Sequence, residues 1–184
     1  MDLLRYLRIQ ARANCLANHR LHEAMSALSH HSFHATRTAF FPSIALTLNH
    51  ILVVDLYYVS ALYREAELKR RYREFQPCES LAELTQRQAE SDERLIAFCE
   101  ALDAPGLDAM IDMERSTHVQ TDRAGHVLAH LFMHQTHHRG QVHAMLSGTD
   151  IKPPQLDEFL MPTDAEFRVK DMAALRWNER EVYG

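Results

Sequence analysis

Apolar side chains recur every three or four residues along four long stretches of this chain, a spacing that places them on one face of an α-helix. The stretches run from about Leu3 to Ser29, from about Pro42 to Arg64, from Ser80 to the Pro105-Gly106 pair, and from Thr121 or Asp122 to Leu146. No segment shows a convincing strand pattern. The pattern predicts an all-α protein, most economically a four-helix bundle.

Local signals support several of these helix ends. Pro42 suits the first turn of a helix, where its missing N–H is not needed. Ser80 followed by Glu83 forms a capping box, and Pro105-Gly106 is expected to end the third helix. The predicted inward faces are Leu46, His50, Val54, Tyr57 and Ala61; Leu84, Gln88, Ser91, Leu95, Phe98 and Leu102; and Val127, Leu131, His134, His138, Val142 and Met145.

The segments between these helices lack a clear period. His30–Phe41 is expected to be a connection, and Leu107–Gln120 to be irregular. Because the connections exceed the shortest loops of an up-and-down bundle, at least one crossover is expected.

We expect one domain over residues 1–184, with a bundle at 1–150 and a tail at 151–184 that packs on it. The tail begins with Pro153-Pro154, and a short helix is expected around Met172–Trp177. Its short apolar clusters are Leu156, Phe159 and Leu160.

Charge and composition exclude some classes of partner. The net charge of −5 argues against general nucleic-acid binding, which needs a surplus of Lys and Arg. The basic run Lys69–Arg73 follows Glu65 and Glu67, a spacing typical of a solvated helix end. The apolar stretch Ile44–Tyr63 is interrupted by polar residues such as His50, which favours a buried helix over a membrane span.

Cysteine usage and the first residues favour the cytoplasm. Cys15, Cys78 and Cys99 are far apart and odd in number, as expected of reduced thiols. The first residues are too polar for the core of a signal peptide.

The chain contains 13 histidines, and three of them lie on predicted inward faces. His134 and His138 are four residues apart, so both imidazoles can reach one ion. That spacing also occurs in other histidine pairs of this chain and is a weak signal alone. His50 occupies the inward face of a second helix. A buried imidazole needs a metal or a hydrogen-bond partner, so a three-nitrogen metal site and three separately bonded core histidines both remain open.

The other histidines and the carboxylates offer less. His19, His22, His30, His31 and His34 are expected to be solvated, and His126, His130, His137 and His143 to lie at the surface, with His130 and His137 the hardest to exclude. Asp55 lies too far round its helix to ligate with His50, and suits a structural salt bridge better than the orientation of a neighbour. No HExxH, GxSxG, P-loop or GxGxxG motif is present.

The segment His134–Gln141 resembles the HxxxHRGQ signature of the DinB family, whose members are metal-binding helical bundles unrelated to the DNA polymerase of that name. Phe41-Pro42-Ser43 with Thr47–Asp55 is similar to the family's first ligand helix, and Pro153–Phe159 to its tail. The resemblance implies a crossover between helices 2 and 3, often a homodimer, and zinc or nickel held by His50, His134 and His138. It also implies polar support from Arg139 and Gln141, and close helix approach at Gly140.

Three neutral imidazoles leave a coordination position open, as in catalytic metal sites. The resemblance implies a metal-dependent thiol S-transferase or hydrolase that acts on a small-molecule thiol or electrophile. The alternative is a stress-related dimer that binds metal or ligand without catalysis. No general base is obvious, and Asp55, Tyr57 and Tyr58 are the candidates.

Overall fold

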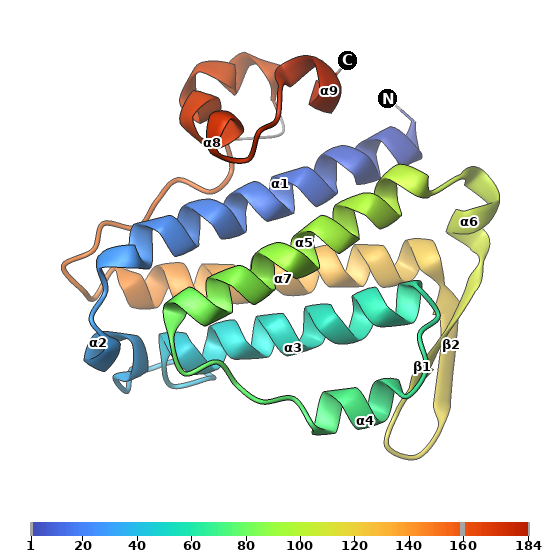
Figure 1. Cartoon of the computed structure of the whole chain (residues 1–184), viewed down its shortest axis with the longest axis horizontal. Coiled ribbons are helices and arrows are strands. Elements are labelled where there is room, and N and C mark those ends of the chain that lie inside the picture. The colour runs from blue at the N-terminus through green and yellow to red at the C-terminus, as the bar shows by residue number, and fades with distance from the viewer. Residues whose placement is uncertain (1, 159–160, 184) are drawn as a thin grey trace.

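The computed structural model describes residues 2–158 and 161–183, so Phe159 and Leu160 of the predicted tail clusters lie outside the described residues. It is mostly helical (Figure 1). Four long helices dominate: α1 (Leu3–Ala24), α3 (Ile44–Leu62), α5 (Leu81–Ala101) and α7 (Ala124–Leu146). Helix α1 packs on α5 and α7, and α3 packs on the same two helices. The four predicted helices are therefore present and share one core.

Capping side chains mark the starts of α3 and α5. Ser43 Oγ accepts a hydrogen bond from the backbone N–H of Leu46 (3.1 Å), so α3 starts at Ile44 and Pro42 precedes it. The prediction that Pro42 opens the helix was wrong by two residues. The capping role of Ser80 is confirmed, because its Oγ accepts from the N–H of Glu83 (3.2 Å).

The segment between α3 and α5 returns along the length of the molecule, since both helices run in the same direction (Figure 1). It carries a short helix, α4 (Leu68–Arg73), which contains the basic run. The turn between α3 and α4 contains Arg64 and Glu67, and both have left-handed backbone conformations (φ 56° and 62°). A conformation that non-glycine residues rarely adopt is thus used twice to turn the chain from α3 into α4.

A β-hairpin occupies the region predicted to be irregular. Strand β1 (Met110–Glu114) pairs antiparallel with β2 (Val119–Arg123), with Asp112 opposite Thr121. The prediction that no strand forms was wrong, and so was a helix start at Thr121 or Asp122, since both residues lie in β2. The hairpin packs through the alternate side chains of β1, Ile111 and Met113, but the exposed Met110 is also apolar, so the alternation of apolar and polar residues is incomplete.

Three short helices modify the predicted boundaries. The first long helix ends at Ala24 and is followed by a 3₁₀ turn (Met25–Ala27) and α2 (His30–His34) within the expected connection. The Pro105-Gly106 pair lies inside a short helix, α6 (Ala104–Asp108), capped by Asp103. Helix α5 has already ended at Ala101, so the pair does not stop it.

The tail folds back on α1. It contains a 3₁₀ segment (Pro162–Arg168), α8 (Val169–Ala174) and α9 (Glu179–Tyr183), where a single helix around Met172–Trp177 was expected. The Arg20 guanidinium of α1 is buried under the tail, 2.8 Å from the Asp171 carboxylate, and it also donates to two backbone carbonyls of the tail. This ion pair and a small apolar cluster attach the tail to the long helices.

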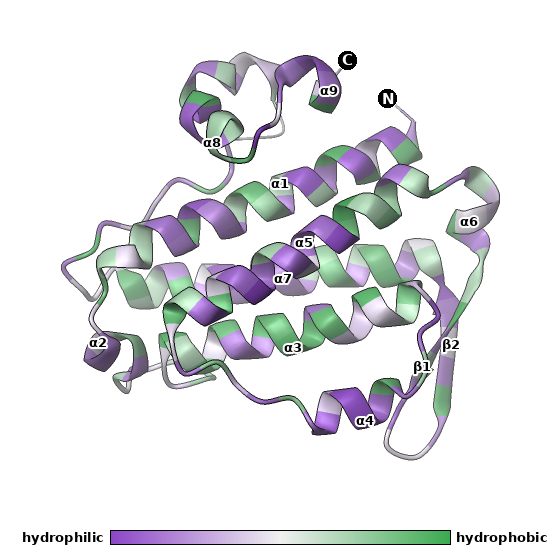
Figure 2. Cartoon of the chain, in the orientation of Figure 1, coloured by the Kyte–Doolittle hydropathy of each residue, from purple (hydrophilic) through white to green (hydrophobic). Residues whose placement is uncertain are grey.

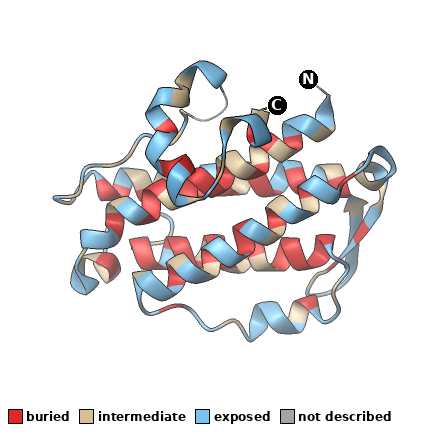
Figure 3. Ribbon diagram, turned by 45° about the horizontal axis from the view of Figure 1, so that its top comes forward, coloured by how far each residue is buried: buried red, intermediate tan, exposed pale blue. Residues whose placement is uncertain are grey.

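Helix α3 is the most apolar of the long helices, and hydrophobic positions run along most of its length (Figure 2). Within the described residues it is the one helix long and apolar enough to cross a membrane, and 72% of that window is buried. Figure 3 shows the buried residues concentrated on the long helices. The predicted inward position of Leu46 was wrong, since its side chain is 51% exposed, whereas Val54, Tyr57 and Ala61 are buried.

Candidate metal centre

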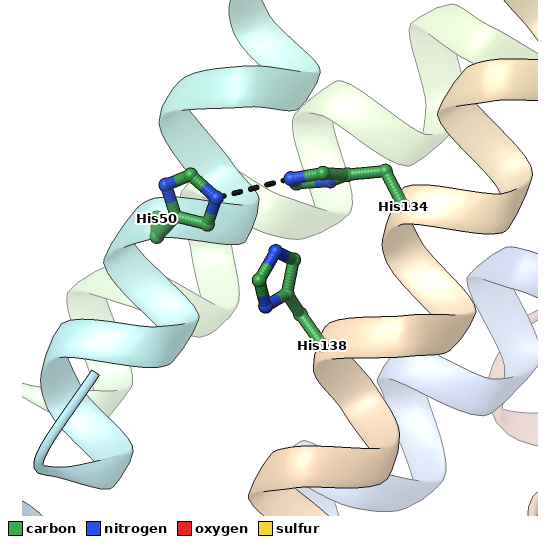
Figure 4. A group of neighbouring side chains, drawn as sticks. All are labelled: His50, His134 and His138. Atoms are coloured by element: carbon green, nitrogen blue, oxygen red, sulfur yellow. Dashed lines mark hydrogen bonds between the residues drawn. The ribbon is translucent and has the colours of Figure 1, made fainter. Parts of the chain in front are cut away.

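Three histidines converge between α3 and α7. His50 comes from α3, and His134 and His138 come from successive turns of α7 (Figure 4). The Nε2 atoms of His50 and His134 are 3.0 Å apart, and one ring nitrogen from each of the three side chains lies within 4.8 Å of the others. With metal–nitrogen bonds of about 2 Å, this spacing suits a single shared ion.

Neighbouring groups hold two of the rings in place. The Nδ1 atom of His138 lies 2.8 Å from the side-chain carbonyl of Gln141, which leaves its Nε2 for the centre. The Phe41 ring packs on His50, with 4.3 Å between ring centroids. The polar support expected from Gln141 is therefore present.

The protonation state of the three rings suits a metal ion. Burial, with the neighbouring imidazoles, lowers the pKa of His50 to about 4 and that of His134 to about 3. Burial also lowers the pKa of His138, although the hydrogen bond with Gln141 acts in the opposite direction. All three imidazoles are therefore neutral near pH 7, and each has a nitrogen lone pair that can bind a metal cation. The Nδ1 of His134 is buried and has no partner among the described residues, so its Nε2, 3.0 Å from that of His50, is the nitrogen that this ring offers to the centre.

A pocket of about 570 Å³ opens over the three rings. Tyr57 and Tyr58 of α3, Tyr72 of α4 and Arg115 of the hairpin loop form part of its wall, and His130 lies beside Tyr58. A volume of this size is that of a small-molecule site. Sequence reasoning left His130 open but missed Tyr72 and Arg115, because the crossover and the hairpin bring them here from outside the long helices.

A buried polar network lies behind the three histidines, between α1, α3, α5 and α7. Its members are Asn14, Asn18, Asp55, Gln88, Asp92, Gln135 and Arg139. Arg139 donates to both asparagines and to Gln135, and the asparagine amides donate to Asp92. Arg139 is thus a core residue linked to Asp92 through amides.

Two expectations about this region were wrong. Asp55 forms no salt bridge within the described chain; it accepts hydrogen bonds from the Gln88 amide (2.7 Å) and the Gln135 amide. Burial and the nearby Asp92 raise its pKa well above the ordinary carboxyl value. Gly140 is exposed, and a Cβ built there would meet nothing within 4 Å, so it permits no close helix approach in this chain.

The remaining histidines are mostly exposed or half-buried, with one exception. His22 is 5% exposed, against the expectation that it would be solvated, because it lies on the inner side of the last turns of α1. His19, Glu23 and Asp171 also lie close enough to hold a cation, but Arg20 already pairs with Asp171 at 2.8 Å. We assign that group to the attachment of the tail.

The burial of His22 makes the stability of the fold depend on pH. Burial and the nearby Arg139 lower its pKa from 6.5 to about 4, so the folded state keeps it neutral while the unfolded state takes up a proton below pH 6.5. Its contribution is complete above that pH and falls as the pH decreases towards 4, by roughly 2–3 kcal/mol at one pKa unit per 1.36 kcal/mol. The free energy of unfolding in urea is measured for chelator-treated protein at pH 7.5 and at pH 4.5. Between these pH values, His22→Gln is expected to lose less stability than wild type, and the difference is expected to be about this amount. The exposed His31→Gln serves as control, and equal losses in wild type and His22→Gln would contradict the assignment.

The fold and this site together define a class: a helical protein with three converging histidines at the floor of a pocket, able to hold a divalent metal ion. A comparison with protein families assigns it more closely, since the DinB family profile matches residues 10–170. The chain belongs to the DinB family. A comparison with curated proteins found no match.

Proposed function

We propose that this protein binds one divalent metal ion, zinc or nickel, through His50, His134 and His138, and acts as a metal-dependent thiol S-transferase or hydrolase. The observation that carries the proposal is the convergence of three neutral imidazoles at the floor of a pocket. Neutral imidazole suits both metals.

The position of the pocket favours catalysis over a closed structural site. Three protein ligands would leave at least one coordination position of a bound ion for water or substrate, and all three histidines line the pocket through which a ligand would reach it. A metal ion bound there would supply Lewis acidity, lowering the pKa of water or of a substrate thiol.

The pocket also limits which side chains can handle protons. Tyr57 donates its hydroxyl hydrogen bond to the backbone carbonyl of Glu114 (2.6 Å), and burial raises its pKa, so it is a poor base. Asp55 lies in the buried network and does not line the pocket. His130 lines the pocket with its ring 6.2 Å from His134, between centroids, and we assign it the role of proton acceptor.

We propose the four-helix bundle with a crossover between the second and third long helices, supported by the parallel course of α3 and α5 (Figure 1). A cytoplasmic homodimer is proposed from the family resemblance and the three free cysteines, and light scattering after gel filtration tests the dimer.

A screen of low-molecular-weight thiols with electrophilic substrates tests the activity. We expect thiol consumption by the zinc- or nickel-loaded protein, loss after chelation, and loss in His134→Ala. The His130→Gln variant is expected to retain its metal and lose at least about 100-fold in kcat, the usual contribution of general acid–base catalysis. Tight metal binding without turnover across a broad panel would instead support the non-catalytic alternative.

A further inference from the structure

The pocket that the three histidines line also carries an excess of positive charge. Lys69 and Arg73 come from α4, and Arg115 comes from the hairpin loop that follows strand β1. The single carboxylate of the wall, Glu114, is already engaged, because its Oε2 accepts from the backbone N–H of Lys69 (2.9 Å). The wall therefore holds three cations and one anion.

None of the three cations is neutralised within the described chain. The Lys69 ammonium donates to the backbone carbonyl of Ser116 (2.7 Å), which is uncharged. The Arg115 guanidinium donates to the Tyr58 hydroxyl (3.0 Å) and to the Gln120 side chain (3.1 Å). No carboxylate lies within ion-pair distance of Lys69, Arg73 or Arg115 in residues 2–158 and 161–183. By contrast, Arg70 and Arg71 on the same short helix each pair with a glutamate.

Arg115 is held in a fixed position. Its guanidinium lies 5.5 Å from the ring centroids of both Tyr57 and Tyr58, within cation–π range, in addition to its hydrogen bonds. A guanidinium held this way loses little side-chain entropy when it binds a planar anion, and its N–H fork matches a carboxylate.

Apart from Ser116 and the histidines, the rest of the wall is aromatic or apolar. Tyr57, Tyr58 and Tyr72 line the same pocket, and Val54 lies on α3 between His50 and these tyrosines in the sequence. Aromatic surface suits the body of a flat or apolar ligand, and the volume of about 570 Å³ suits a small molecule. The net charge of −5 disfavours a polyanion such as nucleic acid as the occupant.

We propose that Arg115, with Lys69 and Arg73, binds the carboxylate of a small organic acid whose apolar or aromatic body lies against the tyrosines. This specificity deepens the proposed function and rests on it, in that the acid would be the substrate or co-substrate whose reactive end faces the three histidines. The cation wall comes from the crossover and the hairpin, so these two insertions select the ligand while the long helices hold the histidines.

Binding of phenylacetate and of its neutral isostere phenylacetamide tests the proposal. Both are titrated by calorimetry into the full chain, once loaded with zinc and once after chelation, because a carboxylate could also bind the metal directly. We expect phenylacetate to bind at least about tenfold more tightly than the amide in both forms. The preference is expected to fall below about twofold in Arg115→Gln and to persist in Arg123→Gln, which removes a charge from the same hairpin outside this pocket.

A second variant guards against disruption of the hairpin. Lys69→Gln with Arg73→Gln, on α4, is expected to weaken the same preference without changing any hairpin residue. Equal binding of acid and amide by wild type, an unchanged preference in both variants, or tighter binding of inorganic phosphate than of phenylacetate would overturn the proposal. Zinc content is measured in the same samples. One zinc per chain without a carboxylate preference would leave the metal site standing. A carboxylate preference in protein that takes up no zinc, even when zinc is supplied, would overturn the proposed function but not the acid site.

Discussion

Replacement of His134 by alanine is expected to abolish the metal binding proposed for this protein. The His134 ring contacts both other rings, with its Nε2 3.0 Å from that of His50 and its ring centroid 4.5 Å from that of His138. Loss of a group that only supports a ligand typically costs 10–100-fold in metal affinity. Loss of a ligand itself is therefore expected to cost at least about 100-fold.

Elemental analysis of untagged protein measures the effect. We expect about one zinc or nickel per chain in wild type and a loss in His50→Ala, His134→Ala and His138→Ala. The matched control is His126→Ala, an exposed histidine on the same helix as His134, which pairs with Asp122 away from the site.

Thermal unfolding adds a second readout. Free zinc at a hundred times its dissociation constant would stabilise the wild type by about 2.7 kcal/mol and leave the three variants unchanged. An unloaded wild type, even after zinc or nickel is supplied, would leave the three histidines as core residues.

Replacement of Arg139 by methionine is expected to destabilise the fold by about 3–5 kcal/mol. This is the usual cost of removing one of two buried opposite charges, which leaves the other uncompensated. Arg139 is buried and donates to Asn14, Asn18 and Gln135. Burial lowers its pKa to about 10 and raises that of Asp92 to about 6, so near pH 7 the cation and the carboxylate coexist in the core. Without Arg139, the Asp92 charge has no compensating cation in the network.

Urea unfolding at pH 7.5 measures this loss, and a double variant identifies its cause. Asp92→Asn in the Arg139→Met background removes the uncompensated charge, so part of the lost stability is expected to return. The exposed Arg123→Gln should change stability by less than about 0.5 kcal/mol. Arg139→Met at wild-type stability would show that the amides alone satisfy the network.

Sequence patterns predicted the parts of this protein that depend on the residues of a single helix, namely its apolar face and its cap. The periodic apolar positions located α1, α3, α5 and α7 to within a few residues. Ser80 and Glu83 located the start of α5, because a cap depends on residues within one turn. His50, His134 and His138 were identified as candidates since each lay on an inward face.

Other features were missed because they depend on contacts between distant segments. The buried face of the hairpin comes from two alternate side chains of β1, Ile111 and Met113, too few to form a pattern. His22 lies in the last turn of α1, where the sequence predicted a solvated helix end. It is buried because other elements pack on that end. The family resemblance implied close helix approach at Gly140, but this residue lies on the exposed face of α7 and no other helix of the described chain approaches it.

By itself, the sequence determined the long helices and the inward placement of three histidines, because both depend on the repeat of a single helix. Only the tertiary structure decided that these rings meet, since their convergence requires α3 and α7 to pack at one register. It also decided that Arg115 and Lys69 face the same pocket from separate insertions, and that Arg139 and Asp92 share one buried network. Such groups are 40 or more residues apart along the chain, and the free energy that brings them together comes from burial of the whole core rather than from any local pattern.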